Sequence, residues 1–132
     1  MTRYLLDTAV FLWNSGETRR LGTQVRKLLA SPNVSVFVSA VTSWEISIKY
    51  ASGKLRLPEP AREFTRKRLA ITGFLPLAIT HEHALASGEL PELHQDPFDR
   101  ILIAQAQTEG LVLITGDEQI TKYSVATLSA AK

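Results

Sequence analysis

The sequence contains no cysteine among its 132 residues, which excludes disulfides and thiolate metal sites. It also lacks any apolar run near the roughly 20 residues that a membrane-spanning helix needs. An acid at Asp7 comes too early for the apolar segment of a secretory signal. These absences lead us to expect a cytoplasmic protein that has no membrane segment.

Motifs of several enzyme classes are missing as well. There is no Gly-rich phosphate loop and no G-x-S-x-G nucleophile motif. Asp7-Thr8 is similar to the start of phosphatases with an aspartyl nucleophile, but the second acid that they need is replaced by Ala9. The histidines lack the i, i+4 spacing of a helical zinc pair, and we expect surface or capping roles for all three: His81, His83 and His94.

The composition is that of a folded domain with a mildly basic balance. Apolar residues make up 45% of the chain and the net charge is +2, so we expect residues 1–132 to form a single domain. Basic residues gather in two clusters, Arg62, Arg66, Lys67 and Arg68, and Lys49, Lys54 and Arg56. Such clusters suit a polyanionic substrate, although a solvated helix face is the more common explanation.

Strand-like and helix-like segments alternate along the chain. Strands are predicted at 4–7, 34–38, the end of 75–79 and 111–115, with a weak one near 125–128. Helices are predicted from near Ala9 and over 18–30, 43–51, 61–71, 80–87 and 97–109, the last ended by Gly110. This alternation predicts an α/β fold of three α/β/α layers, in which a central parallel sheet is covered on both faces.

Four acids stand where predicted strands end or helices begin: Asp7, Glu45, Asp99 and Asp117. In open α/β sheets, ligands bind outside the carboxyl ends of the strands, so these carboxylates can meet at one edge. Clustered carboxylates repel one another unless a cation neutralises them. The set therefore predicts a site with oxygen ligands for Mg²⁺ or Mn²⁺.

Each acid also has a structural explanation. Asp7 or Thr8 can cap the first helix, and Thr42-Ser43-Trp44-Glu45 fits a capping box. In Asp96-Pro97-Phe98-Asp99 we assign Asp96 to the cap, which leaves Asp99 either for chemistry or as a first-turn acid. Asp117, taken alone, is an exposed turn residue. Arg100 is open to a phosphate contact, a pair along the helix, or solvation.

Three motifs give the chain its resemblance to a known family: Tyr4-Leu5-Leu6-Asp7-Thr8, Ser43-Trp44-Glu45-Ile46, and Asp96-Pro97-Phe98-Asp99-Arg100 before Ile101-Leu102-Ile103-Ala104. Thr115-Gly116-Asp117 fits the Thr-x-Asp pattern that is the last motif of the family along the chain. With these motifs the chain resembles a PIN domain, and more narrowly the VapC-type toxins of bacterial toxin–antitoxin pairs.

The resemblance implies a metal-dependent endoribonuclease. Asp7, Glu45, Asp99 and Asp117 would be the catalytic acids, and Asp7, Asp99 and Asp117 would hold Mg²⁺ or Mn²⁺. Thr115 is expected to orient one of the ligating carboxylates without contacting the metal itself. The implied partners are RNA, a cognate antitoxin and a second copy of the chain. The alternatives are a PIN-type nuclease in RNA processing or on DNA flaps, and a non-catalytic binding module.

Overall fold

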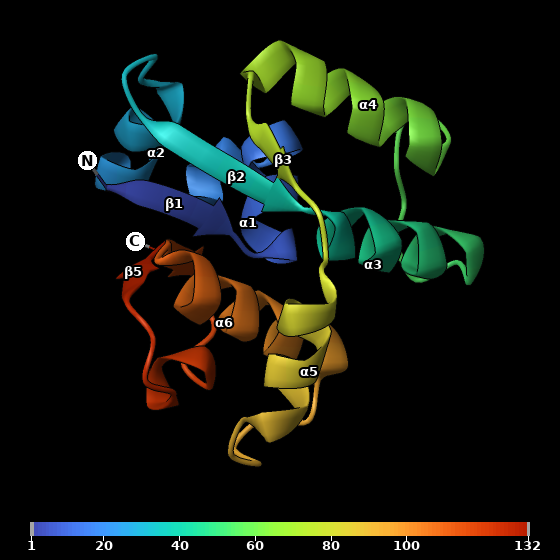
Figure 1. Cartoon of the computed structure of the whole chain (residues 1–132). Helices are drawn as coiled ribbons and strands as arrows, with labels where there is room; N and C mark the ends of the chain where they lie inside the picture. The colour runs from blue at the N-terminus through green and yellow to red at the C-terminus, as the bar shows by residue number, and fades with distance from the viewer. Residues whose placement is uncertain (1, 132) are drawn as a thin grey trace.

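Five parallel strands form the centre of the computed structural model, which describes residues 2–131 (Figure 1). The strands are β1 (Arg3–Leu6), β2 (Ser35–Ser39), β3 (Leu75–Leu77), β4 (Val112–Thr115) and β5 (Thr127–Ser129). Their order across the sheet is β3-β2-β1-β4-β5, and every neighbouring pair is parallel. The predicted parallel sheet is therefore confirmed, with β1 at its centre.

Within residues 2–131, six α-helices flank this sheet: α1 (Thr8–Gly16), α2 (Thr23–Ala30), α3 (Ala40–Ala51), α4 (Ala61–Thr72), α5 (His81–Glu89) and α6 (Pro97–Glu109). Leu5 and Leu6 are both fully buried but belong to different apolar clusters, because successive strand residues point to opposite faces. The Leu6 cluster packs against α1, α2 and α4, and the Leu5 cluster packs against α6. The three-layer α/β/α architecture is thus confirmed.

The helix predicted over 18–30 is interrupted in the structure. A short 3₁₀ helix covers Thr18–Arg20, and α2 starts only at Thr23. At the break, Leu21 forms an antiparallel bridge with Ala131, and the Gly22 N–H donates to the Ala130 carbonyl. Pairing with the distant C-terminal segment therefore overrides the helical preference of this stretch.

The helix that carries Glu45 begins earlier than predicted. Ser39, the last residue of β2, caps α3 by accepting a hydrogen bond from the Val41 N–H. Thr42 and Ser43 consequently lie inside the helix, and the capping box predicted for Thr42 and Glu45 is wrong. Glu45 is buried on α3 without any capping role.

The remaining helices agree with prediction to within a residue or two, because their end signals are local. Thr80 caps α5, Asp96 caps α6, and Gly110 ends α6 with a left-handed φ of 69°. Gly73 ends α4 in the same way, with a φ of 72°. Between residues 2 and 131, no helix is both long and apolar enough to cross a membrane.

Candidate functional site

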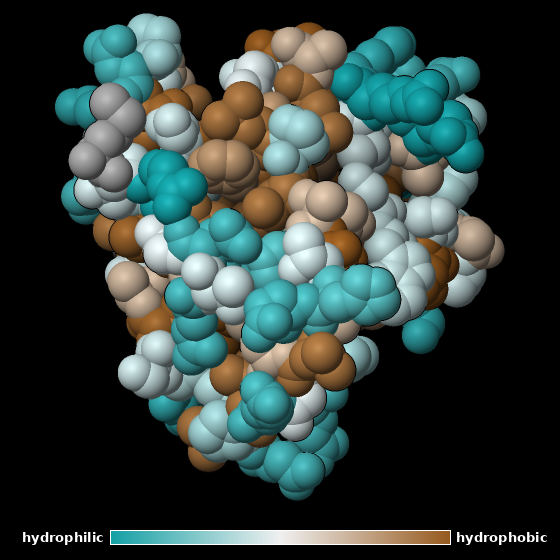
Figure 2. All heavy atoms as spheres, in the orientation of Figure 1, coloured by the Kyte–Doolittle hydropathy of each residue, from teal (hydrophilic) through white to brown (hydrophobic). Residues whose placement is uncertain are grey.

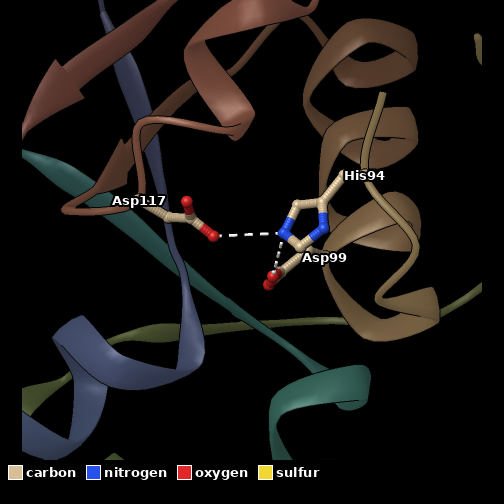
Figure 3. A group of neighbouring side chains, drawn as sticks. All are labelled: His94, Asp99 and Asp117. Carbon is tan, nitrogen blue, oxygen red and sulfur yellow. Dashed lines mark hydrogen bonds and ion pairs between the residues drawn. The ribbon is translucent and has the colours of Figure 1, made fainter. Parts of the chain in front are cut away.

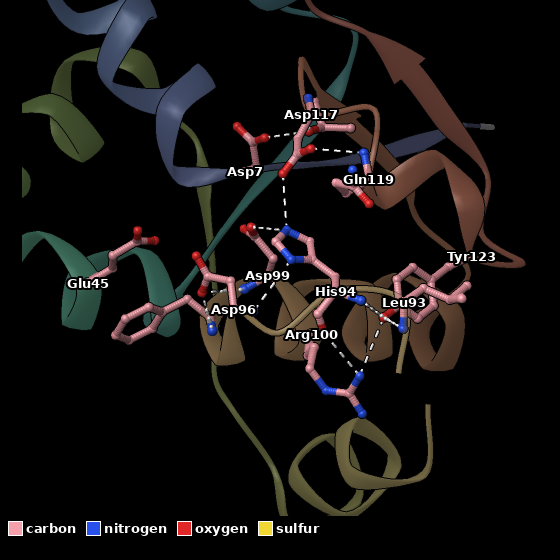
Figure 4. Close-up of polar contacts among 12 residues, drawn as sticks. Asp7, Glu45, Leu93, His94, Asp96, Asp99, Arg100, Asp117, Gln119 and Tyr123 are labelled. Atoms are coloured by element: carbon pink, nitrogen blue, oxygen red, sulfur yellow. Dashed lines mark hydrogen bonds and ion pairs between the residues drawn. The ribbon is translucent and has the colours of Figure 1, made fainter. Parts of the chain in front are cut away.

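The four acids line one hollow of about 330 Å³ at the carboxyl edge of the sheet. Asp7 follows β1, Glu45 comes from α3, Asp99 from the first turn of α6, and Asp117 from the turn after β4 (Figure 4). The wall is completed by Thr8, Ala9, Trp13, Lys49, Asp96 and Gly116. Residues separated by more than a hundred positions therefore share one site.

Sheet topology explains why the acids meet there. The chain builds the sheet from β1 outward through β2 and β3, and then returns to the other side of β1 with β4 and β5. The strand order therefore reverses between β1 and β4, which is where open α/β sheets bind ligands. Leu6 pairs with Ile114 across this junction, so Asp7 and Thr115 emerge side by side.

Asp7 is buried, and each of its carboxylate oxygens accepts one hydrogen bond. Its Oδ1 caps α1 by accepting from the Val10 N–H at 2.8 Å, so the helix cap is Asp7 and not Thr8. Its Oδ2 accepts from the Thr115 hydroxyl. Burial raises the pKa of Asp7 to about 6 despite these bonds, and the charges of Asp117 and Glu45 add to the increase.

Thr115 links two of the acids. Its hydroxyl donates to Asp7 and accepts from the Asp117 N–H at 3.0 Å. Asp117 itself lies at the mouth of the hollow, where its Oδ1 accepts from the Gln119 N–H at 2.9 Å. The Thr115 side chain thus sets the position of Asp7 and of the turn that carries Asp117.

Glu45 has one engaged and one free oxygen. Its Oε2 is bonded to the Lys49 ammonium, one helical turn away on α3. Its Oε1 is buried and has no hydrogen-bond partner within residues 2–131. An oxygen of this kind is costly to bury unless something else satisfies it.

Asp96 caps α6 as predicted, and the Asp99 side chain takes no part in that cap. Asp96 Oδ1 accepts from the Phe98 and Asp99 N–H groups and caps α6, and Pro97 takes the first helical position. Asp99 faces the hollow. Its pKa is raised to about 7, chiefly by burial and then by the charges of Asp96 and Asp7, while His94 opposes the increase.

His94 is a member of the site that sequence reasoning missed. Its Nε2 lies 2.9 Å from Asp99 Oδ2 and 3.1 Å from Asp117 Oδ2, between the two carboxylates (Figure 3). The surface or capping role predicted for the histidines is wrong for His94 and is confirmed for His83, which belongs to the α5 capping box. The available signal was its place two residues before Asp96, at the start of the third motif.

These groups fit a hard divalent cation. The hollow offers carboxylate oxygens from four segments, one of them the buried and unpartnered Glu45 Oε1. Burial, and then the charges of neighbouring acids, raise the pKa values of Asp7 and Asp99, and a bound cation would favour their ionised forms. Asp99 and Asp117 each offer a carboxylate oxygen within 4.8 Å of the other, a spacing compatible with a single ion. Oxygen-rich sites of this type suit Mg²⁺ and Mn²⁺.

Comparison with known proteins identifies relatives by sequence. A family model described as PIN domain matches residues 4–126. Ribonuclease VapC16 of Mycobacterium tuberculosis is 37% identical over 67 residues, which are 51% of this chain and 43% of that protein. The match thus spans less than half the length of this curated relative.

Solved structures share the fold over nearly the whole chain. VapBC2 from Rickettsia felis, bound to a DNA fragment from its promoter, has a TM-score of 0.73 at 17% identity and covers 96% of this chain and 98% of that one. A toxin–antitoxin complex from Klebsiella pneumoniae has a TM-score of 0.66 at 22% identity, with 96% of both chains covered. VapBC-5 from M. tuberculosis has a TM-score of 0.63 at 15% identity, with 100% of both chains covered. At these identities the likeness shows the fold alone.

Proposed function

Because the chain belongs to the PIN domain family, we propose that it is a metal-dependent endoribonuclease and the toxin of a toxin–antitoxin pair. The observation that carries this proposal is the acidic hollow, in which carboxylates from four segments surround a buried oxygen that has no partner. The relative named as a ribonuclease and the toxin–antitoxin complexes of the same fold support it. We further propose that residues 1–132 form one domain, since Leu6 and Ala130 share an apolar cluster.

In the proposed mechanism, Asp7 and Asp99 hold Mg²⁺ or Mn²⁺, and Asp117 contributes directly or through water. The ion, when bound, activates a water and stabilises the charge that develops on the phosphate. Thr115 keeps the Asp7 carboxylate in place through its hydroxyl. Glu45 would use its free Oε1 to position the water, to take its proton or to ligate a second ion, while Lys49 holds the other oxygen.

The proposed macromolecular partners are an antitoxin and a second copy of this chain. The structural relatives are toxin–antitoxin complexes, which supports an inhibitory protein partner. Trp44 and Ile48 are about half exposed on α3 and offer apolar surface for a protein contact. Mass measurement of the purified chain, alone and with the product of an adjacent small gene, tests both partners.

The direct test of the function is RNA cleavage by the purified chain. A mixed pool of structured RNAs is incubated with Mg²⁺, Mn²⁺ or EDTA, and a pool of flap-bearing DNA serves as the alternative substrate. Cleavage of RNA that requires the ion is the expected result. Cleavage of DNA flaps alone would favour the alternative of a PIN-type nuclease that acts on DNA flaps. Well-folded protein that neither cleaves nucleic acid nor binds an ion would indicate a non-catalytic binding module.

Glu45→Gln is expected to lower the cleavage rate about 10²- to 10⁴-fold, the usual contribution of a general base. Mn²⁺ affinity should change only a few-fold, because the main ligands remain. Rate and affinity are measured on the same preparation, by single-turnover cleavage and by titration calorimetry. The matched control is Glu82→Gln at an exposed position on α5. An equal loss of affinity and rate would instead make Glu45 an ion ligand.

A second hollow, of about 250 Å³ between α3 and α4, suits RNA phosphates outside the reaction centre. It presents Arg62 and Arg66, one turn apart on α4, opposite the hydroxyls of Ser43 and Ser47 on α3. No ion pair within the described chain involves either arginine. Hydrophilic side chains gather over α4 at the upper right of Figure 2.

Replacing Arg62 and Arg66 together by Ala should therefore weaken RNA binding and its salt dependence. Loss of two phosphate contacts on a single strand lowers the slope of log affinity against log salt by about 1.4. Binding is measured by fluorescence anisotropy in an Asp99→Asn background, which leaves the RNA uncut. Arg26→Ala with Lys27→Ala on exposed positions of α2 is the control, and an unchanged slope in the α4 variant would rule out the contact.

A further inference from the structure

A hydrogen-bonded clamp holds the loop between α5 and α6, which places His94 against Asp99 and Asp117, two acids of the hollow (Figure 4). One nitrogen of the Arg100 guanidinium donates to the Ser87 and Leu90 carbonyls at 2.8 and 3.0 Å. The other donates to the Pro91 and His94 carbonyls at 2.9 and 3.3 Å. Arg100 is thus neither a phosphate contact nor a solvated side chain, as the sequence alone allowed, but the anchor of this loop.

Tyr123 completes the clamp from the other side. Its buried hydroxyl accepts from the Leu93 and His94 N–H groups at 3.1 and 2.8 Å and donates to the Pro91 carbonyl at 2.9 Å. The backbone of His94 is therefore held at both its N–H and its carbonyl. These hydrogen bonds to a short irregular loop restrict the position of His94, whose imidazole lies between two site carboxylates.

The hydrogen bonds also define what the imidazole does. Its Nδ1 accepts from the Asp96 N–H at 3.4 Å, so the proton of the neutral ring lies on Nε2. That Nε2–H donates toward Asp99 Oδ2 and Asp117 Oδ2, and both carboxylates keep further lone pairs for an ion. These contacts of 2.9 and 3.1 Å let the imidazole hold Asp99 and Asp117 near each other, although two carboxylates would otherwise repel.

We propose that His94 is a positioning residue that bridges Asp99 and Asp117, two carboxylates that would hold the ion, and that Arg100 and Tyr123 act through His94. This inference rests on the proposed function, because it assigns the imidazole to the ion-binding carboxylates. Outer partners that orient ligating groups typically change metal affinity 10- to 100-fold when they are removed. His94 has the contacts of such a partner, and its place is fixed by hydrogen bonds within the protein itself.

Binding of Mn²⁺ and of Mg²⁺ to the metal-free full chain, measured by titration calorimetry, tests the proposal. His94→Ala should weaken the affinity for both ions 10- to 100-fold, and His94→Gln, which keeps a side-chain N–H donor, should recover most of the loss. His81→Ala, at the exposed start of α5, is the matched control and should leave affinity unchanged. Circular dichroism and thermal midpoints establish that each variant is folded.

A double-mutant comparison separates positioning from general stability. Tyr123→Phe removes the acceptor of the His94 N–H and should weaken ion binding several-fold, but it should add almost nothing in a His94→Ala background. Unchanged or tighter binding in His94→Ala would overturn the proposal, and a loss confined to Mn²⁺ would overturn it in favour of the imidazole as a direct ligand. Wild-type chain that binds neither ion would instead refute the proposed function itself.

Discussion

Replacing Asp99 by Asn is expected to abolish metal-dependent RNA cleavage while making the ion-free protein more stable. The substitution keeps the size of the side chain and removes a charge that lies in the acidic hollow near His94, Asp96 and Asp7. Losing one charged ligand should cost several kcal/mol of transition-state stabilisation, and about 4 kcal/mol corresponds to roughly 10³-fold in rate. Asp7→Asn should behave in the same way.

The gain in stability follows from the raised pKa of Asp99. Its carboxyl has a pKa of about 7 in the folded chain against 3.8 as the ordinary value, so at neutral pH and above its ionised form favours unfolding. An amide has no such charge, and we expect the free energy of unfolding at pH 8 to rise by about 1–3 kcal/mol, discounted for coupling with the neighbouring acids.

Single-turnover cleavage and urea unfolding in EDTA measure the two effects on one preparation. Asp96→Asn is the matched control, because Asn caps a helix about as well as Asp and the ion-binding acids are untouched. It should cleave RNA within a few-fold of the wild-type rate. Asp99→Asn protein that unfolds more easily would favour a structural role for this acid, and retained cleavage would remove it from the mechanism.

The stability of the ion-free protein is expected to fall as pH rises from about 4 to 8, and divalent ions should reverse that fall. Both Asp7 and Asp99 have folded pKa values, about 6 and about 7, above the ordinary 3.8. At pH values between the ordinary pKa and the folded pKa of each acid, the folded chain binds more protons than the unfolded chain. Raising the pH through this range therefore lowers the free energy of unfolding. At pH 8 each acid lowers the free energy of unfolding by an amount on the order of 3 kcal/mol, and the two effects together are less than their sum.

An ion that binds the ionised carboxylates opposes this trend. At a concentration 100 times its Kd, it adds about 2.7 kcal/mol to the free energy of unfolding. The stabilisation should be large at pH 8 and small at pH 5, where protons compete with the ion for the same oxygens. Thermal and urea unfolding at pH 5, 6, 7 and 8, with EDTA or with Mn²⁺, measure this linkage.

The variant in which both Asp7 and Asp99 are Asn is the control for this linkage. Its ion-free stability should be much flatter with pH, and Mn²⁺ should add little at any pH. Ion-free wild-type protein that became more stable between pH 5 and pH 8 would contradict the assignment of the raised pKa values. Equal stabilisation by Mn²⁺ in the double variant would place the ion at another site.

Local signals in the sequence were sufficient to predict much of the fold and to single out the four acids. The start of α6 could be predicted from Asp96, Pro97 and Asp99, because capping and the preference for proline at the first helical position act within one turn. Alternation of strands and helices sufficed for a parallel sheet, and hence for the convergence of acids at one edge. At Leu21 and Gly22, where the predicted helix is interrupted, the decisive contact is with residues more than a hundred positions away.

By itself, therefore, the sequence determined the fold class and which acids could meet, since periodicity and helix caps are properties of neighbouring residues. Only the tertiary structure decided how those acids are arranged: the Thr115 bond to Asp7, the free oxygen of Glu45 and the place of His94 between two carboxylates. The Arg100 and Tyr123 bonds that fix the His94 loop join carbonyl and N–H groups that no side-chain pattern encodes. Burial, which raises the pKa values of Asp7 and Asp99, likewise exists only once the layers have packed.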